Sequence, residues 1–431
     1  MPPIARSSLR RARLGLALVA TLLGACATAP SPPPAAGVPA PAAAPTPSTP
    51  TATNETQNPQ GFAQWISDFR DTARAAGVGE ATLHAAFDNP RYLPSVIEQD
   101  RAQPEFTRAV WNYLDNAVSA QRIAAGQDKL LQLRSEADTA AARYGVPPEI
   151  LIAVWGMESN YGSNYGSTST IDALATLGFE GRRAEWARGE LLAALKILDR
   201  GDIGREAMIG SWAGAMGQTQ FLPSSFLAYA VDADGDGRRD IWGSMADVMA
   251  STAHFLSRAG WQAGQPWGAE VRLFPGFDPA RADPSIRQSS TQWAAEGLQS
   301  ADGQPLPVFA DAWVLLPAGS RGPAFLVGPN FRAILRYNNS TSYALAVGLL
   351  AQRIAGGPGV QAPWPRELAM LTRSQMMALQ TALNERGFAS GVPDGVMGPA
   401  TREGVRRYQR SIGLPADGFP TLELLQRLQP P

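Results

Sequence analysis

The chain has 431 residues and a formal net charge of -1. It is long enough for two or more domains and has no charge excess that would attract nucleic acid. Two histidines, His84 and His254, and one cysteine, Cys26, exclude a cysteine–histidine zinc cluster and an intrachain disulfide, and leave little room for a Ser–His–Asp triad. Catalysis is therefore expected to depend on carboxylates.

The first 26 residues have the pattern of an export signal. Four arginines precede an apolar run, Leu14–Leu23, that is too short to span a bilayer. Small residues then lead to Cys26, which resembles the end of a bacterial lipoprotein signal and would become a lipid-modified N-terminus. The alternative is a plain secretory signal cleaved near Ala27 or Ala29, with the cysteine incidental. Because Ala27 follows the cysteine instead of Asp, we expect anchoring in the inner leaflet of the outer membrane, facing the periplasm.

Residues 27–60 contain Pro, Ala, Thr and Ser with almost no charge. Such a segment cannot bury a core and is expected to be an extended linker, with a reach of about 100 Å. A mainly helical (α+β) domain is then predicted over 61–356, with a short strand-bearing insertion between 264 and 325. Its predicted helices are Phe62–Ala76, Glu80–Phe87, Gln103–Ser119, Gly126–Tyr144, Ser169–Leu177, Arg182–Arg200, Met245–Ala259 and Phe331–Ile354.

A further helix is predicted to begin at Pro147 and Pro148, because proline suits the first helical turn. Its apolar residues recur at spacings of three and four, and Glu158 falls on the same stripe. A desolvated carboxyl group can have a pKa of roughly 6 and act as an acid near neutral pH. The alternative is a Glu at the end of the helix that points into water.

The segment Gly156–Gly162, with Glu158 in its centre, resembles the catalytic motif of lysozyme-like lytic transglycosylases. Four further stretches are similar to the family of membrane-bound lytic murein transglycosylase B, in the same order along the chain. They are Ile171–Leu177, Arg182–Glu185, Ser211–Ser225 and Arg336–Ser340. The resemblance covers residues 61–355 and implies a lysozyme-like fold.

The resemblance implies cleavage of peptidoglycan glycan strands without water and without a catalytic cofactor. Glu158 would protonate the oxygen between N-acetylmuramic acid and N-acetylglucosamine, then accept the proton of the muramoyl C6 hydroxyl as a 1,6-anhydro sugar forms. An internal nucleophile at high effective concentration removes the need for a second carboxylate. Two alternatives stay open: a hydrolytic muramidase with Asp172 or Glu185 as base, and a wall-binding scaffold without activity.

The resemblance also implies substrate contacts in a groove around Glu158, although each of these residues alone could equally be structural. Ser211 and Gln220 match positions that hydrogen-bond the substrate. The arginines Arg182 and Arg183 match a pair that can bind carboxylates of the substrate. The residues that match contacts to acetamido groups are Tyr337, Asn338 and Tyr343.

An aspartate-rich loop at 232–247 resembles half of an EF-hand. Its first, third, fifth, seventh and ninth positions are Asp232, Asp234, Asp236, Arg238, which would offer its carbonyl, and Asp240. Gly243 stands where the closing Glu belongs. The family has a longer loop closed by a later Asp, and Asp247 is the matching residue. The loop predicts a structural calcium ion; a turn cluster without an ion is the alternative.

A Gly- and Pro-rich linker at 357–370 precedes a small module at 371–430. Two predicted helices and the turns Asp394-Gly395 and Asp417-Gly418 resemble the three-helix peptidoglycan-binding domain, over Thr372–Leu428. A helical bundle with another purpose is the alternative. The chain is thus expected to be a monomer that binds peptidoglycan glycan strands.

Overall fold

The computed structural model describes residues 59–102 and 109–429. The predicted export signal with Cys26, the linker up to residue 58 and the first part of the predicted helix Gln103–Ser119 lie outside the described residues. These predictions are therefore not tested by the fold. Within the described ranges, none of the helices combines the length and the apolar character needed to cross a membrane.

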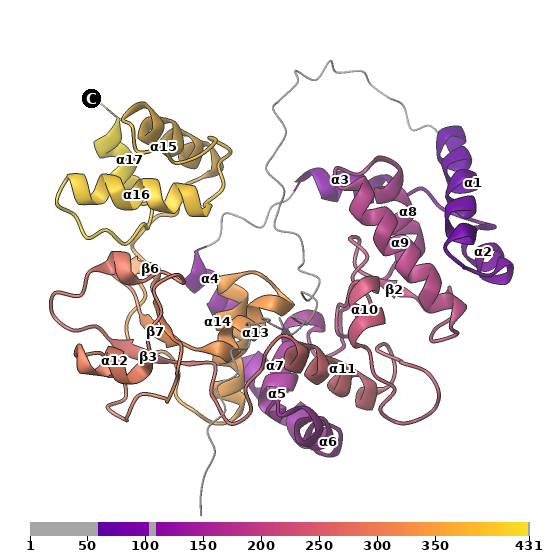
Figure 1. Ribbon diagram of the computed structural model, residues 1–431, viewed down its shortest axis with the longest axis horizontal. Helices are drawn as coiled ribbons and strands as arrows, with labels where there is room; N and C mark the ends of the chain where they lie inside the picture. Colours follow the sequence, from indigo (N-terminus) through magenta and orange to yellow (C-terminus); the bar gives the residue numbers. More distant parts are fainter. Residues whose placement is uncertain (1–58, 103–108, 430–431) are drawn as a thin grey trace, which may run out of the picture. The chain divides into compact units, whose positions relative to one another are not determined.

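Helices dominate the described chain, as predicted (Figure 1). The first eleven are α1 (Pro59–Ala75), α2 (Glu80–Phe87), α3 (Pro94–Ala102), α4 (Val110–Ala117), α5 (Ala120–Gln132), α6 (Arg134–Tyr144), α7 (Pro148–Ser159), α8 (Thr170–Glu180), α9 (Ala184–Asp199), α10 (Pro223–Tyr229) and α11 (Met245–Arg258). Later come α12 (Ser290–Ala295), α13 (Pro329–Tyr337), α14 (Thr341–Ile354), α15 (Arg373–Glu385), α16 (Pro399–Ser411) and α17 (Leu422–Leu428).

Two helices predicted as continuous are each divided in two. Gly126–Tyr144 spans parts of α5 and α6, which meet at Leu133. Phe331–Ile354 is divided between α13 and α14, because Asn338 is extended and the Ser340 hydroxyl accepts a hydrogen bond from the backbone N–H of Tyr343. Such a side-chain cap starts a new helix. The short helices α3 and α10 were not predicted.

The central helix, α7, is buried on all sides and not only along one stripe. Leu151, Ile152, Ala153 and Val154 are fully buried, and α5, α6, α11 and α14 pack around the helix. A second core joins α1, α2, α8 and α9 through residues such as Phe69, Leu174 and Leu195. Burying apolar side chains contributes about 25 cal/mol per Å², so α7 is held firmly in place up to its C-terminal end.

The predicted insertion is confirmed as a four-stranded antiparallel sheet with the strand order β4-β3-β7-β5. The strands are β3 (Gly268–Arg272), β4 (Gln299–Ser300), β5 (Trp313–Leu315) and β7 (Ala324–Val327), and β6 (Pro317–Ser320) follows β5. The sheet has its own core with Trp293, Phe309 and Leu326. Two short strands, β1 (Thr168–Ser169) and β2 (Ile209–Gly210), pair elsewhere.

The C-terminal module contains three helices, as predicted. Thr372 and Gln375 form a capping box at the start of α15, which fixes the helix entry. Leu379 and Leu383 of α15 pack with Val405 of α16 and Leu424 of α17. The segment before the module is tied to the large helical domain. The Glu270 carboxylate accepts hydrogen bonds from the backbone N–H groups of Gln361 and Ala362, and Arg366 pairs with Asp115 through both terminal guanidinium nitrogens.

Candidate active site

The end of α7, which carries Glu158, is a tight chain reversal. Asn160, Tyr161 and Gly162 all have positive φ, at 49°, 58° and 78°. The Tyr161 ring folds back over Gly156, where a Cβ would lie 2.5 Å from the ring, and its hydroxyl donates to the carbonyl of Arg122 at 2.7 Å. Glycine is thus required at 156 to make room for the Tyr161 ring, and Gly162 allows the positive φ of the reversal.

Glu158 lies beside Tyr343 of α14, whose hydroxyl donates a hydrogen bond to its Oε1. Burial raises the pKa of Glu158 to about 7, and the bond from Tyr343 lowers it in part. In the two described ranges, no Lys, Arg or His forms an ion pair with this carboxyl group. A Glu with such a pKa is both a competent acid and a competent base at neutral pH, as the apolar stripe predicts.

Two tyrosines of the predicted groove, Tyr337 of α13 and Tyr343 of α14, lie next to Glu158. Burial and the neighbouring Glu158 raise the pKa of both Tyr337 and Tyr343 well above 10, so both stay protonated as hydrogen-bond donors. Tyr337 donates to the carbonyl of Thr219 at 2.7 Å, which connects α13 to the 211–225 loop. The third predicted contact, Asn338, is exposed at the end of α13.

The loop at 211–225 is held by its own hydrogen bonds. The Ser211 hydroxyl accepts from the backbone N–H of Ala215 at 3.1 Å, and the Gln220 amide donates to the carbonyls of Tyr165 and Gly217 at 2.9 and 3.0 Å. A Cβ at Gly214 would lie 2.6 Å from Leu174. Gly214 therefore packs closely against Leu174 inside the domain, where a larger residue would not fit.

Gln218, for which the sequence predicted no role, braces the end of α7. Its Oε1 accepts from the indole N–H of Trp155 at 2.8 Å and its amide donates to the carbonyl of Trp242 at 2.6 Å. Trp155 lies three residues before Glu158 on α7. Because both polar ends of this buried Gln are satisfied, it fixes the position of α7 against the loop. Its place two residues before Gln220 gave no signal of this role.

The predicted groove arginines make contacts away from Glu158. Arg182 donates to the Asp100 carbonyl at 2.6 Å and to its carboxylate at 3.3 Å, which joins α3 to the start of α9. The guanidinium of Arg183 lies 4.4 Å from the Trp186 ring centroid, a cation–π contact. A substrate role for these two side chains stays a prediction.

The two carboxylates considered as a base for water have other environments. Asp172 is fully buried and its carboxylate is shared by Arg205 at 2.8 Å and Arg91 at 2.9 Å. Glu185 has an 87% exposed side chain that pairs with Arg188. Asp172 therefore holds α8 against the segments that carry Arg91 and Arg205. Glu185 is a surface charge.

The aspartate loop gathers three carboxylates. Oxygens of Asp232, Asp234 and Asp247 lie within 4.8 Å of one another. Asp247 is buried, its oxygens accept from the N–H groups of Ala233 and Asp240 at 2.7 Å each, and burial raises its pKa to about 6. An all-oxygen set with a flexible loop suits calcium.

The other predicted ligands lie outside this group of three. The Asp236 carboxylate accepts from the backbone N–H of Arg238, and the Asp240 carboxylate accepts from the N–H groups of Trp242 and Gly243. They shape the turns of the loop. Asp247 lies within the group of three carboxylates, and its role as the closing ligand stays a prediction.

This fold and this site define a class of protein: a lysozyme-like helical enzyme with a glutamate of raised pKa at the end of its central helix and a wall-binding module. The chain belongs to the family of the transglycosylase SLT domain, whose model matches residues 61–352. The model of the peptidoglycan binding domain matches residues 372–428. Both resemblances seen in the sequence are thereby confirmed.

The relatives of the chain are lytic murein transglycosylases. Membrane-bound lytic murein transglycosylase B of Escherichia coli K12 is 39% identical over 219 residues, which are 49% of this chain and 58% of that protein. SltB3 from Pseudomonas aeruginosa, solved in complex with NAG-anhNAM-pentapeptide, is 52% identical with a TM-score of 0.83, covering 86% of this chain and 99% of that one. Escherichia coli Slt35, solved in complex with calcium, is 33% identical with a TM-score of 0.58, covering 69% and 93%.

Proposed function

We propose that this chain is a lytic transglycosylase that cleaves the bond between N-acetylmuramic acid and N-acetylglucosamine in peptidoglycan and leaves 1,6-anhydro ends. The observation that carries the proposal is the single carboxyl group of Glu158, which burial holds near a pKa of 7 beside Tyr343. The relative SltB3 was solved with an anhydro-muropeptide, and cell-wall turnover is the role that follows from such chemistry.

In the first step, protonated Glu158 donates its proton to the glycosidic oxygen as the bond from that oxygen to C1 of the muramoyl sugar breaks. The leaving N-acetylglucosamine departs as an alcohol with that proton, and positive charge develops at C1. The carboxylate that forms keeps the hydrogen bond from Tyr343. A neutral phenol can donate to this charge without altering the net charge of the site.

In the second step, the C6 hydroxyl of the same sugar attacks C1 and its proton passes to Glu158. The new C6–O–C1 bond makes the 1,6-anhydro ring and returns Glu158 to its acid form, so protons and electrons balance without water. The C6 hydroxyl is part of the substrate, which gives it a high effective concentration. One carboxyl group therefore serves both steps, and no cofactor is needed.

Hydrolysis would need a second carboxylate to activate water. Asp172 has both oxygens bound by arginines, and Glu185 projects into solvent, so neither is placed as a base. Mass spectrometry of digested sacculi separates the three functions. Anhydro-muropeptides support the proposal, reducing ends support a muramidase, and intact sacculi support a scaffold without activity.

The pH dependence of kcat/KM should report the acid form of Glu158. With a pKa of about 7, the rate on soluble glycan strands should fall about tenfold for each pH unit above 7, because the proton donor is lost. The bond from Tyr343 lowers this pKa, so Tyr343→Phe should shift the alkaline limb to higher pH. A rate that rises above pH 7 would contradict the assignment of Glu158 as acid.

We also propose that the aspartate loop binds a structural calcium ion through Asp232, Asp234 and Asp247. Millimolar calcium should raise the melting temperature, because an ion bound only by the folded state adds about 2.7 kcal/mol at a hundredfold excess over its Kd. Magnesium should act less. Asp247→Ala and Asp234→Asn should remove the calcium effect, and Asp236→Asn, which lies outside the group of three, should keep it. A calcium shift that survives both ligand changes would place the ion elsewhere.

Finally, we propose that the protein is a periplasmic monomer anchored to the outer membrane through Cys26. The support is the sequence pattern before this cysteine. Cys26→Ser should stay without lipid and should be found in the soluble periplasmic fraction or uncleaved in the inner membrane. If the variant still fractionates with the outer membrane, the anchor must be another part of the chain, such as the wall-binding module.

A further inference from the structure

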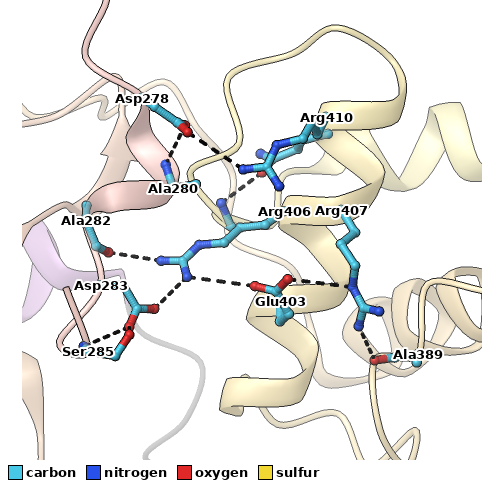
Figure 2. A network of polar contacts seen from close by, with 12 residues as sticks. Asp278, Ala280, Ala282, Asp283, Ser285, Ala389, Glu403, Arg406, Arg407 and Arg410 are labelled. Atoms are coloured by element: carbon cyan, nitrogen blue, oxygen red, sulfur yellow. Dashed lines mark hydrogen bonds and ion pairs between the residues drawn. The ribbon is translucent and has the colours of Figure 1, made fainter.

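The C-terminal module is docked on the strand-bearing insertion of the catalytic domain. Arg406 of α16 has a side chain only 8% exposed, pairs with Asp283 at 2.6 Å and donates to the Ala282 carbonyl at 2.9 Å (Figure 2). Asp417 accepts hydrogen bonds from the N–H and hydroxyl of Ser320 at 2.8 Å each. These contacts, of which the Arg406 ion pair is the most buried, join the module to the insertion.

A cavity of about 350 Å³ lies between the module and the catalytic domain. Its apolar wall includes Trp313 and Leu335 of the catalytic domain and Phe419 of the module. Its polar wall includes Arg402 of α16 and the first-turn residues Thr341 and Ser342 of α14. The next residue of α14, Tyr343, binds Glu158, so the cavity and the catalytic site share one helical turn.

Arg402 is the cation of this cavity that lacks a fixed partner. In the described part of the chain its guanidinium makes no hydrogen bond and no ion pair, and burial lowers its pKa from the ordinary value. Arg402 is partly exposed, so its free guanidinium can reach a ligand in the cavity, and its planar fork matches the two oxygens of a carboxylate.

The other charged side chains of the cavity wall are Arg373, Arg406 and Asp417. Arg373 donates to the carbonyl of Asp394 and Arg406 to Asp283. The oxygens of Asp417 accept from Gln409, Phe419 and Ser320. Arg406 also pairs with Glu403, so Arg402 is the arginine of the cavity wall whose guanidinium is left to bind a ligand.

We propose that this cavity binds the carboxylate end of a peptide stem carried by the glycan strand. Arg402 forms a two-pronged contact with the carboxylate, Thr341 and Ser342 offer hydroxyl donors, and the apolar wall accepts the small side chains beside that end. The inference rests on the proposed function, because peptide stems are what peptidoglycan strands add to the sugar backbone. The module would then select strands with free stem ends and present them next to Glu158.

The test is calorimetric titration of the full chain with two ligands, a disaccharide with a 1,6-anhydro end and a pentapeptide stem, and the same compound with its C-terminal carboxylate amidated. The parent should bind the free acid about tenfold more tightly than the amide, a typical value for one charge-assisted contact. Arg402→Gln should lose that preference and bind both compounds like the amide. Arg402→Lys should restore part of it.

Arg407→Gln is the matched control, since this neighbouring side chain of α16 is exposed and contacts only Glu403 and Ala389 within the module. It should keep the preference for the free acid. Equal binding of acid and amide by the parent, or an unchanged preference in Arg402→Gln, would overturn the proposal. Cleavage of stem-free glycan strands by the parent tests the proposed function separately: if cleavage occurs without the preference, only the cavity assignment fails.

Discussion

Glu158→Gln is expected to reduce the release of anhydro-muropeptides from sacculi by about a thousandfold or more while the fold is kept. The amide cannot donate or accept the proton in either step, and general acid–base catalysis contributes roughly 10²–10⁴-fold to a single step. The Gln side chain keeps the size of Glu and can still accept the hydrogen bond of Tyr343. Chromatography of the released muropeptides measures the effect.

The stability of this variant gives a second, independent readout. The folded-state pKa of Glu158 is raised by burial to about 7, so the contribution of its protonated form is complete below the unfolded pKa and is lost as the pH rises through 7. The variant carries a neutral Gln, whose contribution to stability does not fall as the pH rises. The variant should therefore be at least as stable as the parent above pH 7, with the difference growing from pH 5 to 8.

Glu149→Gln is the control, since Glu149 lies in the first turn of the same helix α7. It should lose only the few tenths of a kcal/mol that a carboxylate contributes at a helix N-terminus and should keep full activity. Release of muropeptides by Glu158→Gln within tenfold of the parent would show that the acid is another group.

The local pattern was enough to predict the acid but not its partner. Glu158 follows Val154 and Leu151 at helical spacings, so its burial could be inferred from the sequence. Tyr343 lies 185 residues later, and only the packing of α14 against α7 brings the two together. Periodicity describes one helix at a time, and the resemblance to the family placed Tyr343 only among the residues that contact the substrate.

The contacts between the two domains also could not be predicted from the sequence. Arg406 and Asp283 are separated by 123 positions. An Arg on a helix is usually exposed, and nothing in the local sequence indicates a partner so far away in the chain. The break between α13 and α14 was missed for a different reason. The helical pattern continues on both sides of Ser340, so the pattern alone does not predict a break there. Whether the Ser340 hydroxyl caps the next helix by accepting from the Tyr343 N–H is decided by tertiary packing.

Asp172→Asn should lower the melting temperature by roughly 6–20 °C and leave the product chemistry unchanged. Asp172 is fully buried. Its carboxylate pairs with Arg91 and Arg205 and accepts a hydrogen bond from the backbone N–H of Arg91, and its own backbone N–H donates to the hydroxyl of Ser169. Removing one partner from a buried ion pair costs about 3–5 kcal/mol, and each kcal/mol shifts the midpoint of a large domain by about 2–4 °C. Thermal unfolding followed by circular dichroism measures the shift.

The same variant separates a structural role of Asp172 from that of a base for water. Folded Asp172→Asn protein, assayed well below its melting temperature, should still release 1,6-anhydro products at a rate close to that of the parent, because the C6 hydroxyl is the nucleophile and Glu158 accepts its proton. Glu185→Gln, which removes the charge of an 87% exposed side chain, should change neither stability nor products. If folded Asp172→Asn were stable but inactive, Asp172 would be acting in the chemistry and the single-carboxyl mechanism would have to be abandoned.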